Sequence, residues 1–507
     1  MASLRLASAL GVLASLLLVT VHAVTQGAPY DDEIGNFHVV EGRDLRSIVE
    51  YANSVDVHPP GSFVINAILF RVLGSWDAVK IAGGCINALA LAFFVWLASE
   101  KLTPRQRFWL TLFGGAAATT ILWGASVRWY AYFNPIFTVS LGLTLFSNIT
   151  RTSRTIALGA AAVLLFHTGY AAICAVPVLL IAHLGRDFQS WNRADLLALA
   201  VTGLVSFIVC LPQLNVFIHV HMHNQAGQVG GLLSAASQTA LTLLLGNAVF
   251  PLAPAPIAAA IVLTATLGYW FYARPKSKTE WLTLAALVIG VVTIIVSGVG
   301  IKPRNSVFLL PLMMLLASAS ISALRPGAQA AVGAALILFQ GLALWNVAYH
   351  KDTLKGSYNS DFRSALLQLR SWNADCARMV VFNHDPVMSY LLDDSDIMQS
   401  SPYERNTRKA VSLADGDCVT VVKTFHGVIP KTTLERMYAL TESIQPRPAK
   451  AADIGRDRYF EIKTRLMHDP FPPWYIRMEM FRADRELSLP DWSTFVTPEG
   501  TARTAND

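Results

Sequence analysis

The stretch LRLASALGVLASLLLVTVHAV, residues 4–24, is apolar over a length that matches the thickness of a bilayer. A helix that crosses the hydrocarbon core needs about 20 apolar residues, because it rises about 1.5 Å per residue. The run is long for the apolar part of a signal peptide, which favours a membrane helix that is retained. Removal as a signal peptide is the alternative, and it leaves the expected topology of the rest unchanged.

Comparable apolar stretches recur up to residue 349 and predict a membrane domain of about eleven spans. The predicted spans are 4–24, 77–99, 106–125, 130–149, 155–168, 170–185, 195–217, 254–273, 280–300, 305–324 and 328–349. The fifth and sixth are short and predict a tight hairpin around HTGY, residues 167–170. Two more apolar segments, 61–74 and 237–250, are too short to span and predict interfacial or re-entrant helices.

The composition divides the 507-residue chain into two parts. The chain is 53% hydrophobic and 15% charged, whereas a soluble domain carries roughly 25% charged residues. The apolar stretches lie in residues 1–349, and residues 350–507 have the composition of ordinary soluble protein. We therefore expect a mainly α fold, with a polytopic transmembrane helical domain over 1–349 and an α/β domain over 350–507.

Basic residues in the short connections predict the orientation of the chain. Alternate connections contain Lys101, Arg105 and Arg107; Arg151 and Arg154; Arg186 and Arg193; Arg274, Lys276 and Lys278; and Arg325. All of them lie on the cytoplasmic side if the N-terminus is cytoplasmic, as the positive-inside rule requires. An odd number of spans then places residues 350–507 outside the inner or plasma membrane. The net charge of +6 resides largely in such loops, so it does not predict nucleic-acid binding.

The segment after residue 350 alternates helical and strand-like patterns. Helical spacing occurs in 361–372, 386–392 and 432–444, and strand-like runs occur in 378–385, 418–425, 458–466 and 474–482. Cys376 and Cys418 each precede one of these strands. If the two strands are neighbours, the cysteines can form a disulfide, which requires an oxidising compartment.

The first predicted outer loop, residues 25–60, is rich in polar groups. It starts with the acidic cluster Asp31, Asp32 and Glu33, continues with an amphipathic segment over 43–54, and ends in SVDVHPPG, residues 54–61. An outward-facing carboxylate can remove a proton from an acceptor hydroxyl. The alternative is that the cluster is a solvated helix N-terminus, where carboxylates suit the helix dipole. The residues alone leave both interpretations open.

Several cations lie on the expected outer side, against the topology rule. Arg128 lies at the outer end of the fourth span, and Lys302 and Arg304 precede the tenth. Cations at separate outer span ends indicate a shared anion, and a phosphate at the membrane surface suits Arg and Lys. Snorkelling side chains or salt bridges with the acidic cluster are the alternative.

The order of these motifs resembles the GT-C family, integral-membrane glycosyltransferases that use polyprenyl-phosphate sugars. Protein O-mannosyltransferases and the lipid A aminoarabinose transferase belong to this group, and the bacterial envelope-glycan branch is the most similar. The motifs that carry the resemblance are the acidic pair Asp32-Glu33, DVHPPG, SVRWYAYF (126–133), LLFHTGYAA (164–172) and KPRNSVFLLPLMMLLA (302–317). The family commonly continues the proline pair with a leucine and an aromatic residue, whereas this chain has Gly61, Ser62 and Phe63.

The resemblance implies inverting sugar transfer from a polyprenyl-phosphate donor to a hydroxyl of a glycan, lipid or protein. It makes Asp32 the expected catalytic base, with Glu33 beside it and Asp31 as a rival. The side chains expected to contact the substrates are Asp56, His58, Arg128, Tyr130, His167, Lys302 and Arg304. No cofactor is required, and a divalent metal is possible.

Two other functions stay open at this point. A transporter is disfavoured because it usually places ionisable residues near the midplane, often in two related halves, and this chain shows neither feature. A ligase or polymerase that acts on polyprenyl phosphates would share the outer cations without needing the acidic loop.

Overall fold

A computed structural model describes residues 2–26, 31–54, 58–218, 254–273, 275–297, 303–348, 362–383, 385–393, 395, 397–400, 411–423, 448–454, 476–483 and 487–489. It divides into two compact units. The first contains residues 1–25 and 36–348, and the second contains residues 26–35 and 349–507. The boundary near residue 348 coincides with the expected end of the membrane domain, while residues 26–35 group with the second unit.

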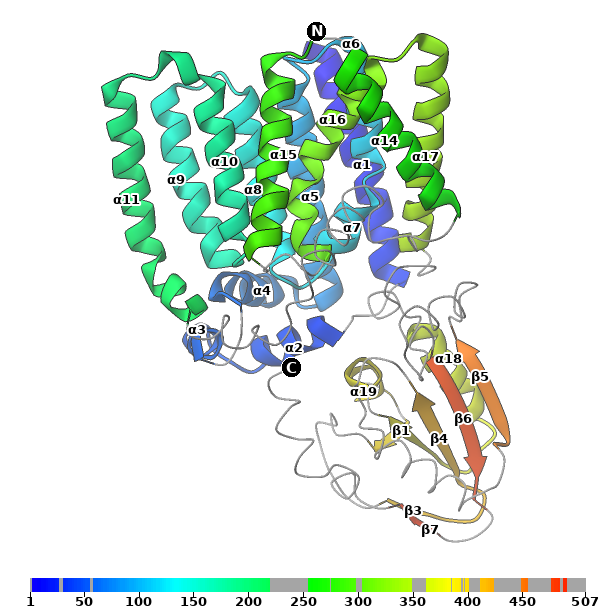
Figure 1. The fold of residues 1–507 in the computed structure, drawn as a ribbon. Helices are drawn as coiled ribbons and strands as arrows, with labels where there is room; N and C mark the ends of the chain where they lie inside the picture. Colours follow the sequence, from blue (N-terminus) through cyan, green and yellow to red (C-terminus); the bar gives the residue numbers. More distant parts are fainter. Residues whose placement is uncertain are drawn as a thin grey trace. The chain divides into compact units, whose positions relative to one another are not determined.

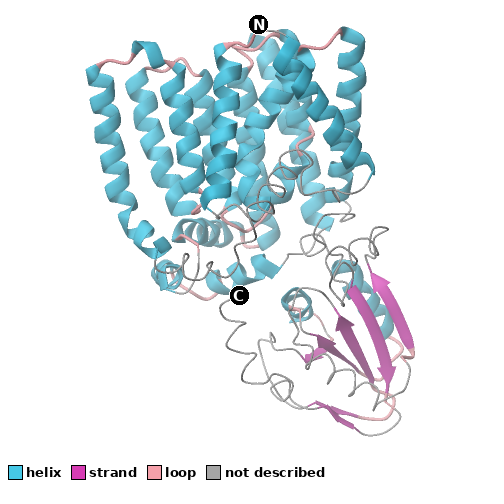
Figure 2. Cartoon of the chain, viewed as in Figure 1, coloured by secondary structure: helices cyan, strands magenta, loops and turns pink. Residues whose placement is uncertain are grey.

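All regular elements in the described part of the chain before residue 349 are helices (Figures 1 and 2). They are α1 (Ala2–Gln26), α2 (Asp31–Val40), α3 (Leu45–Ser54), α4 (Pro60–Leu73), α5 (Trp76–Ala98), α6 (Pro104–Gly115), α7 (Ala118–Gly124), α8 (Tyr130–Phe146), α9 (Arg151–Thr168), α10 (Ala172–Arg186), η1 (Phe188–Ser190), α11 (Arg193–Val216), α14 (Pro254–Ala273), α15 (Lys278–Ser297), η3 (Pro303–Leu309), α16 (Leu310–Ser322) and α17 (Pro326–Ala348). Figure 1 draws the long helices side by side as a bundle, with α3 and α4 across one end of it.

The predicted spans coincide with helices of this bundle. Seven described helices are long and apolar enough to cross a membrane: Leu4–Thr25, Trp76–Ala98, Arg193–Val216, Pro256–Ala273, Lys278–Ser297, Asn305–Ser322 and Pro326–Ala348. The remaining predicted spans form shorter or less apolar helices, so the total of eleven stays a prediction. The hairpin at 167–170 is confirmed, since α9 ends at Thr168 and α10 begins at Ala172. The short helix predicted at 61–74 is α4, and the segment 237–250 lies outside the described residues.

The stretch 106–125 was expected to be one helix, and the structure shows two. Helix α6 ends at Gly115 and α7 begins at Ala118, with Gly114 and Gly115 at the break. Glycine is among the weakest helix formers, so two in succession favour an end there. Helix α6 begins at Pro104, directly after the N-cap residue Thr103. Thr103 and Gln106 form a capping box, which satisfies backbone donors at this end of the helix.

Ion pairs join the ends of α9, α10 and α11 that carry predicted cytoplasmic arginines. Arg154 is buried and pairs with Asp187, and Arg151 pairs with Asp195. Arg186 donates to the carbonyl oxygens of Thr144, in the last turn of α8, and of Ser147, the residue after this helix. The ion pair with Asp187 gives buried Arg154 the partner that burial of a charge requires.

The second unit contains a mixed five-stranded sheet in the order β2-β1-β4-β6-β5. Strand β1 pairs in parallel with β2 and β4, whereas β6 pairs antiparallel with β4 and β5, and a separate antiparallel pair joins β3 to β7. The elements are α18 (Phe362–Asn373), β1 (Met379–Asn383), α19 (Pro386–Asp393), β2 (Met398–Ser400), β3 (Val411–Leu413), β4 (Cys418–Lys423), β5 (Lys450–Ile454), β6 (Ile476–Arg482) and β7 (Leu487–Leu489). The predicted helices at 361–372 and 386–392 and three of the predicted strands are confirmed. The segments 432–444 and 458–466 lie outside the described residues.

Neighbouring strands β1 and β4 are cross-linked where they begin. Cys376 and Cys418 form a disulfide, which confirms the pairing that the sequence left open. Beside it, Arg378 donates to Asp417, as does the N–H of Ala414. Burial raises the pKa of Asp417, but these hydrogen bonds outweigh it and leave the pKa below its ordinary value.

Candidate functional site

The acidic cluster opens helix α2. Asp31, Asp32 and Glu33 form its first turn, where carboxylates suit the helix dipole. Glu33 is fully buried, so the solvated alternative does not hold for this residue. The same helix continues to Asn36, one turn after Asp32, and ends at Val40.

Arg128 lies in the loop between α7 and α8 and is buried, with 8% of its surface exposed. Its Nη1 donates to Oδ1 of Asn36 at 3.3 Å, and its Nη2 lies 3.4 Å from Nε2 of His58. A guanidinium has donors alone, so a hydrogen bond between these two groups requires Nε2 of His58 to be the acceptor. The structure thus brings together two predicted substrate-binding residues that are 70 positions apart.

The backbone next to Arg128 is held by two asparagines. The carbonyl oxygen of Val127 accepts from Nδ2 of Asn36 and, at 3.3 Å, from Nδ2 of Asn66 in α4. Oδ1 of Asn66 in turn accepts from the hydroxyl of Tyr132. Sequence reasoning missed Asn36, Asn66 and Tyr132. The available signal was a single amide in an apolar helical run, as in SFVINAILF, residues 62–70.

The start of α4 is packed tightly against the end of α9. Pro59 precedes the helix and Pro60 is its first residue, a position where the missing N–H costs nothing. At Gly61 an added Cβ would lie 3.0 Å from the carbonyl carbon of His167, and nearer still to its oxygen. Gly61 therefore permits the close approach of two helices next to His58, which gives a physical reason for the departure from the family pattern.

Two more predicted substrate-binding residues have described side chains. His167 is half-buried, and its Nδ1 lies 2.9 Å from the carbonyl oxygen of Val163 in its own helix. Tyr130 is fully buried, with its ring edge-on to Trp123 at 5.1 Å and to Trp129 at 5.4 Å. Their contacts with a substrate stay predictions.

The other predicted site residues cannot be placed by side chain. The side chains of Asp31, Asp32 and Arg304, and the whole of Asp56 and Lys302, lie outside the described residues. The backbone positions of the first three are known, since Asp31 and Asp32 begin α2 and Arg304 is the second residue of η3.

An aromatic stack fixes the second half of α2. Trp76, the first residue of α5, has Phe37 on one face and Phe70 on the other, each at 4.2 Å between ring centroids. Its Nε1 donates to Glu41 at 2.7 Å. Stacked aromatic pairs contribute about 0.5–1.5 kcal/mol each beyond burial, so this stack holds α2, α4 and α5 together.

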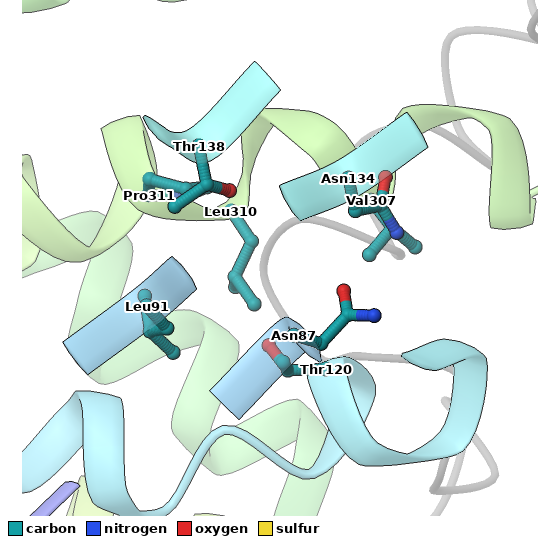
Figure 3. Close-up of a pocket in the computed structure, with 8 residues that line it drawn as sticks. All are labelled: Asn87, Leu91, Thr120, Asn134, Thr138, Val307, Leu310 and Pro311. Atoms are coloured by element: carbon teal, nitrogen blue, oxygen red, sulfur yellow. The ribbon is translucent and has the colours of Figure 1, made fainter. Parts of the chain in front are cut away.

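A small polar cavity of about 20 Å³ lies between α5, α7, α8 and the start of α16, with room for about one water molecule (Figure 3). Figure 3 shows the side-chain amides of Asn87 and Asn134 at this cavity, from α5 and α8. Pro135 has no N–H for the carbonyl of Ala131, and Nδ2 of Asn87 donates to that carbonyl at 2.7 Å instead. The cavity is too small for a sugar, and Asn87 stabilises the first turns of α8 where Pro135 leaves a backbone carbonyl without its helical partner.

Comparison with solved structures shows which fold this is. ArnT from Cupriavidus metallidurans in the apo state matches with a TM-score of 0.50 and 12% identity, over 92% of this chain and 97% of that one. The chain has a GT-C-like fold. ArnT from the same organism bound to undecaprenyl phosphate matches with a TM-score of 0.49 and 11% identity, over 92% and 97% of the two chains. No protein-family profile matches the sequence, and no curated protein matches it.

The GT-C-like fold confirms the expected architecture, a helical membrane domain followed by a small domain with a sheet. At 12% identity the similarity concerns the fold alone, so the roles of individual residues rest on their chemistry and contacts.

Proposed function

We propose that the chain is an inverting glycosyltransferase, which moves a sugar from a polyprenyl-phosphate donor to a hydroxyl of an envelope glycan, lipid or protein. The observation that carries the proposal is buried Arg128, held by Asn36 of the helix that begins with the acidic cluster and by His58. The GT-C-like fold adds support, since enzymes of the family that the motifs resemble use such donors.

Burial of an arginine costs free energy, because the charged side chain loses its contact with water. Removing an ion from water costs several kcal/mol even after relaxation, and hydrogen bonds recover part of that. A phosphate is a suitable ligand for such a buried arginine, because the planar guanidinium fork matches two phosphate oxygens. We assign Arg128 to the donor phosphate, together with Lys302 and Arg304.

In the proposed reaction the acceptor hydroxyl attacks the anomeric carbon from the side opposite the phosphate. The new glycosidic bond forms as the bond between that carbon and the phosphate oxygen breaks, which inverts the configuration. Asp32 takes the hydroxyl proton as general base, and the polyprenyl phosphate leaves with the electron pair. We assign His58, Asp56, Tyr130 and His167 to contacts with the substrates. The proposed chemistry does not require a cofactor.

The proposed orientation places the N-terminus in the cytoplasm and the second unit outside the inner or plasma membrane. The disulfide between Cys376 and Cys418 supports it, because such bonds persist in oxidising compartments and are rare in the cytosol.

The experiment that tests the function compares wild type with Asp32→Asn in membranes supplied with radiolabelled polyprenyl-phosphate sugars. We expect transfer to fall about 100-fold or more, the contribution of a positioned base, while the protein stays inserted. Asp44→Asn is the matched control, since Asp44 is exposed in the same loop and asparagine keeps its capping bond to Ser47. Full activity in Asp32→Asn would move the base to Asp31. A wild type that transfers no sugar from any such donor would refute the proposal.

A further inference from the structure

We propose that Asn36 is a positioning residue, which fixes the guanidinium of Arg128 in the orientation that receives the phosphate of the lipid-linked substrate. The inference rests on the proposed function, because it takes the anion at Arg128 to be a polyprenyl phosphate.

The side-chain amide of Asn36 is used on both sides. Its Nδ2 donates to the carbonyl oxygen of Val127, while its Oδ1 accepts from Nη1 of Arg128 at 3.3 Å. One flat amide therefore spans two consecutive residues, the backbone of one and the side chain of the next. Exchange of its oxygen and nitrogen would break both bonds, so its orientation is fixed by these contacts.

An unheld arginine would have to be ordered by its ligand. Fixing a long flexible side chain costs rotamer freedom, which weakens the binding of the ligand that has to order it. The bond from Nη1 to Asn36 stops rotation of the fork before any phosphate arrives, and Asn36 is itself buried. The affinity for a phosphate then depends on position 36, although Asn36 need not touch the ligand.

The structure offers a matched control in Asn66. It donates to the same carbonyl oxygen of Val127, at 3.3 Å, from the neighbouring helix α4. Its Oδ1 accepts from Tyr132 rather than from Arg128. Loss of Asn66 therefore weakens the support of the loop but leaves the bond between Asn36 and the guanidinium in place.

The test measures binding of undecaprenyl phosphate to the purified full chain in detergent, by native mass spectrometry. It compares wild type with the single variants Asn36→Ala, Asn66→Ala and Arg128→Ala. Two double variants join Arg128→Ala to Asn36→Ala and to Asn66→Ala. We expect Asn36→Ala to weaken binding about 5- to 10-fold, and the pair of Asn36→Ala with Arg128→Ala to bind like Arg128→Ala alone. For the pair of Asn66→Ala with Arg128→Ala, we expect the fold-losses of affinity of the two single variants to multiply. If the fold-losses also multiply for the pair of Asn36→Ala with Arg128→Ala, the inference is overturned.

A second variant separates orientation of the charge from packing. Asn36→Asp keeps the size of the side chain but places a carboxylate at Nη1, where it competes with the phosphate for Arg128. We expect it to weaken binding about 10- to 100-fold, more than Asn36→Ala does. Aspartate also places an oxygen where Nδ2 of Asn36 donates to the carbonyl of Val127, so the control is Asn66→Asp, which makes the same change at that carbonyl without a contact to Arg128. A purely structural role predicts equal losses of affinity from Asn36→Asp and Asn66→Asp.

The outcomes distinguish the inference from the function beneath it. A wild type that does not bind undecaprenyl phosphate would overturn the proposed function. A wild type that binds it, with Asn36→Ala and Asn36→Asp each within twofold of its affinity, would overturn the role of Asn36 alone.

Discussion

The substitution Gly61→Ala tests the packing on which the candidate site depends. Gly61 is the second residue of α4, three positions after His58, and its α-carbon faces the backbone of His167 in α9. We expect alanine to push these two helices apart and to lower both the stability of the protein and the proposed transferase activity.

The size of the effect follows from the geometry. The added Cβ would lie 3.0 Å from the carbonyl carbon of His167, whereas carbon atoms pack best at about 3.5–4.0 Å, so the helices must separate by about 0.5 Å or more. The obstacle is backbone, which cannot rotate away as a side chain can. Overpacking of this kind costs about 1–3 kcal/mol, and each kcal/mol lowers the unfolding temperature of a unit of this size by roughly 1–2 °C.

The assay is thermal unfolding of the purified chain in detergent, followed by intrinsic fluorescence. Gly203→Ala in α11 is the matched control, because an added Cβ meets nothing within 4 Å there and alanine favours a helix by about 1 kcal/mol. The expected order of unfolding temperatures is Gly61→Ala below wild type and Gly203→Ala at or above it. An unchanged unfolding temperature for Gly61→Ala would refute the close approach of α4 to α9.

Other parts of the chain give further tests. Asn87→Leu should lower thermal stability by about 1–3 kcal/mol, because it leaves a carbonyl unpaired, and Pro135→Ala should restore the loss by returning the helical N–H. Cys376→Ser should weaken the second unit by about 2–4 kcal/mol and speed its cleavage by trypsin; Cys418→Ser should match it, and the double variant should add nothing. The pKa of Asp417 is lower folded than unfolded, so its stabilisation is complete above the ordinary value of 3.8 and is lost as the pH falls below it. Pepsin cleavage of the second unit between pH 2 and 5 should show this loss, and Asp417→Asn should reduce the pH dependence but not abolish it, because Lys450 also lowers the pKa of Asp375 in the same unit.

The sequence predicted most helices because their signal is local. A run of about 20 apolar residues marks a span whatever it packs against, and the hairpin at 167–170 follows from two such runs in close succession. The strongest strands, β1, β4 and β6, were predicted for the same reason, since they are rich in Val, Ile and Phe or alternate in polarity. Strand β5, KAADI, was missed because its residues have little strand preference and its partner β6 supplies the pairing.

The candidate site was predicted only in part because its contacts are long-range. His58 and Arg128 could be named from their chemistry, but no local pattern reveals that Nε2 of His58 lies 3.4 Å from Nη2 of Arg128. Asn36 and Asn66 were missed because each reads as an isolated polar residue, and their shared acceptor is a backbone carbonyl without a sequence signature. Contacts of this kind depend on how the helices pack, which periodicity does not encode.

In the loop between α7 and α8, different groups hold the backbone and contact the charged side chain of Arg128. The carbonyl of Val127 lies between two helices and needs partners because an unpaired buried carbonyl costs about 1–3 kcal/mol, and two asparagines supply them. The carbonyl of Val127 keeps its partner Asn66 even if the guanidinium of Arg128 is removed. On the other side, the guanidinium contacts an amide oxygen of Asn36 and an imidazole nitrogen of His58. We therefore expect Arg128→Ala to change the proposed binding of phosphate more than it changes the stability of the protein.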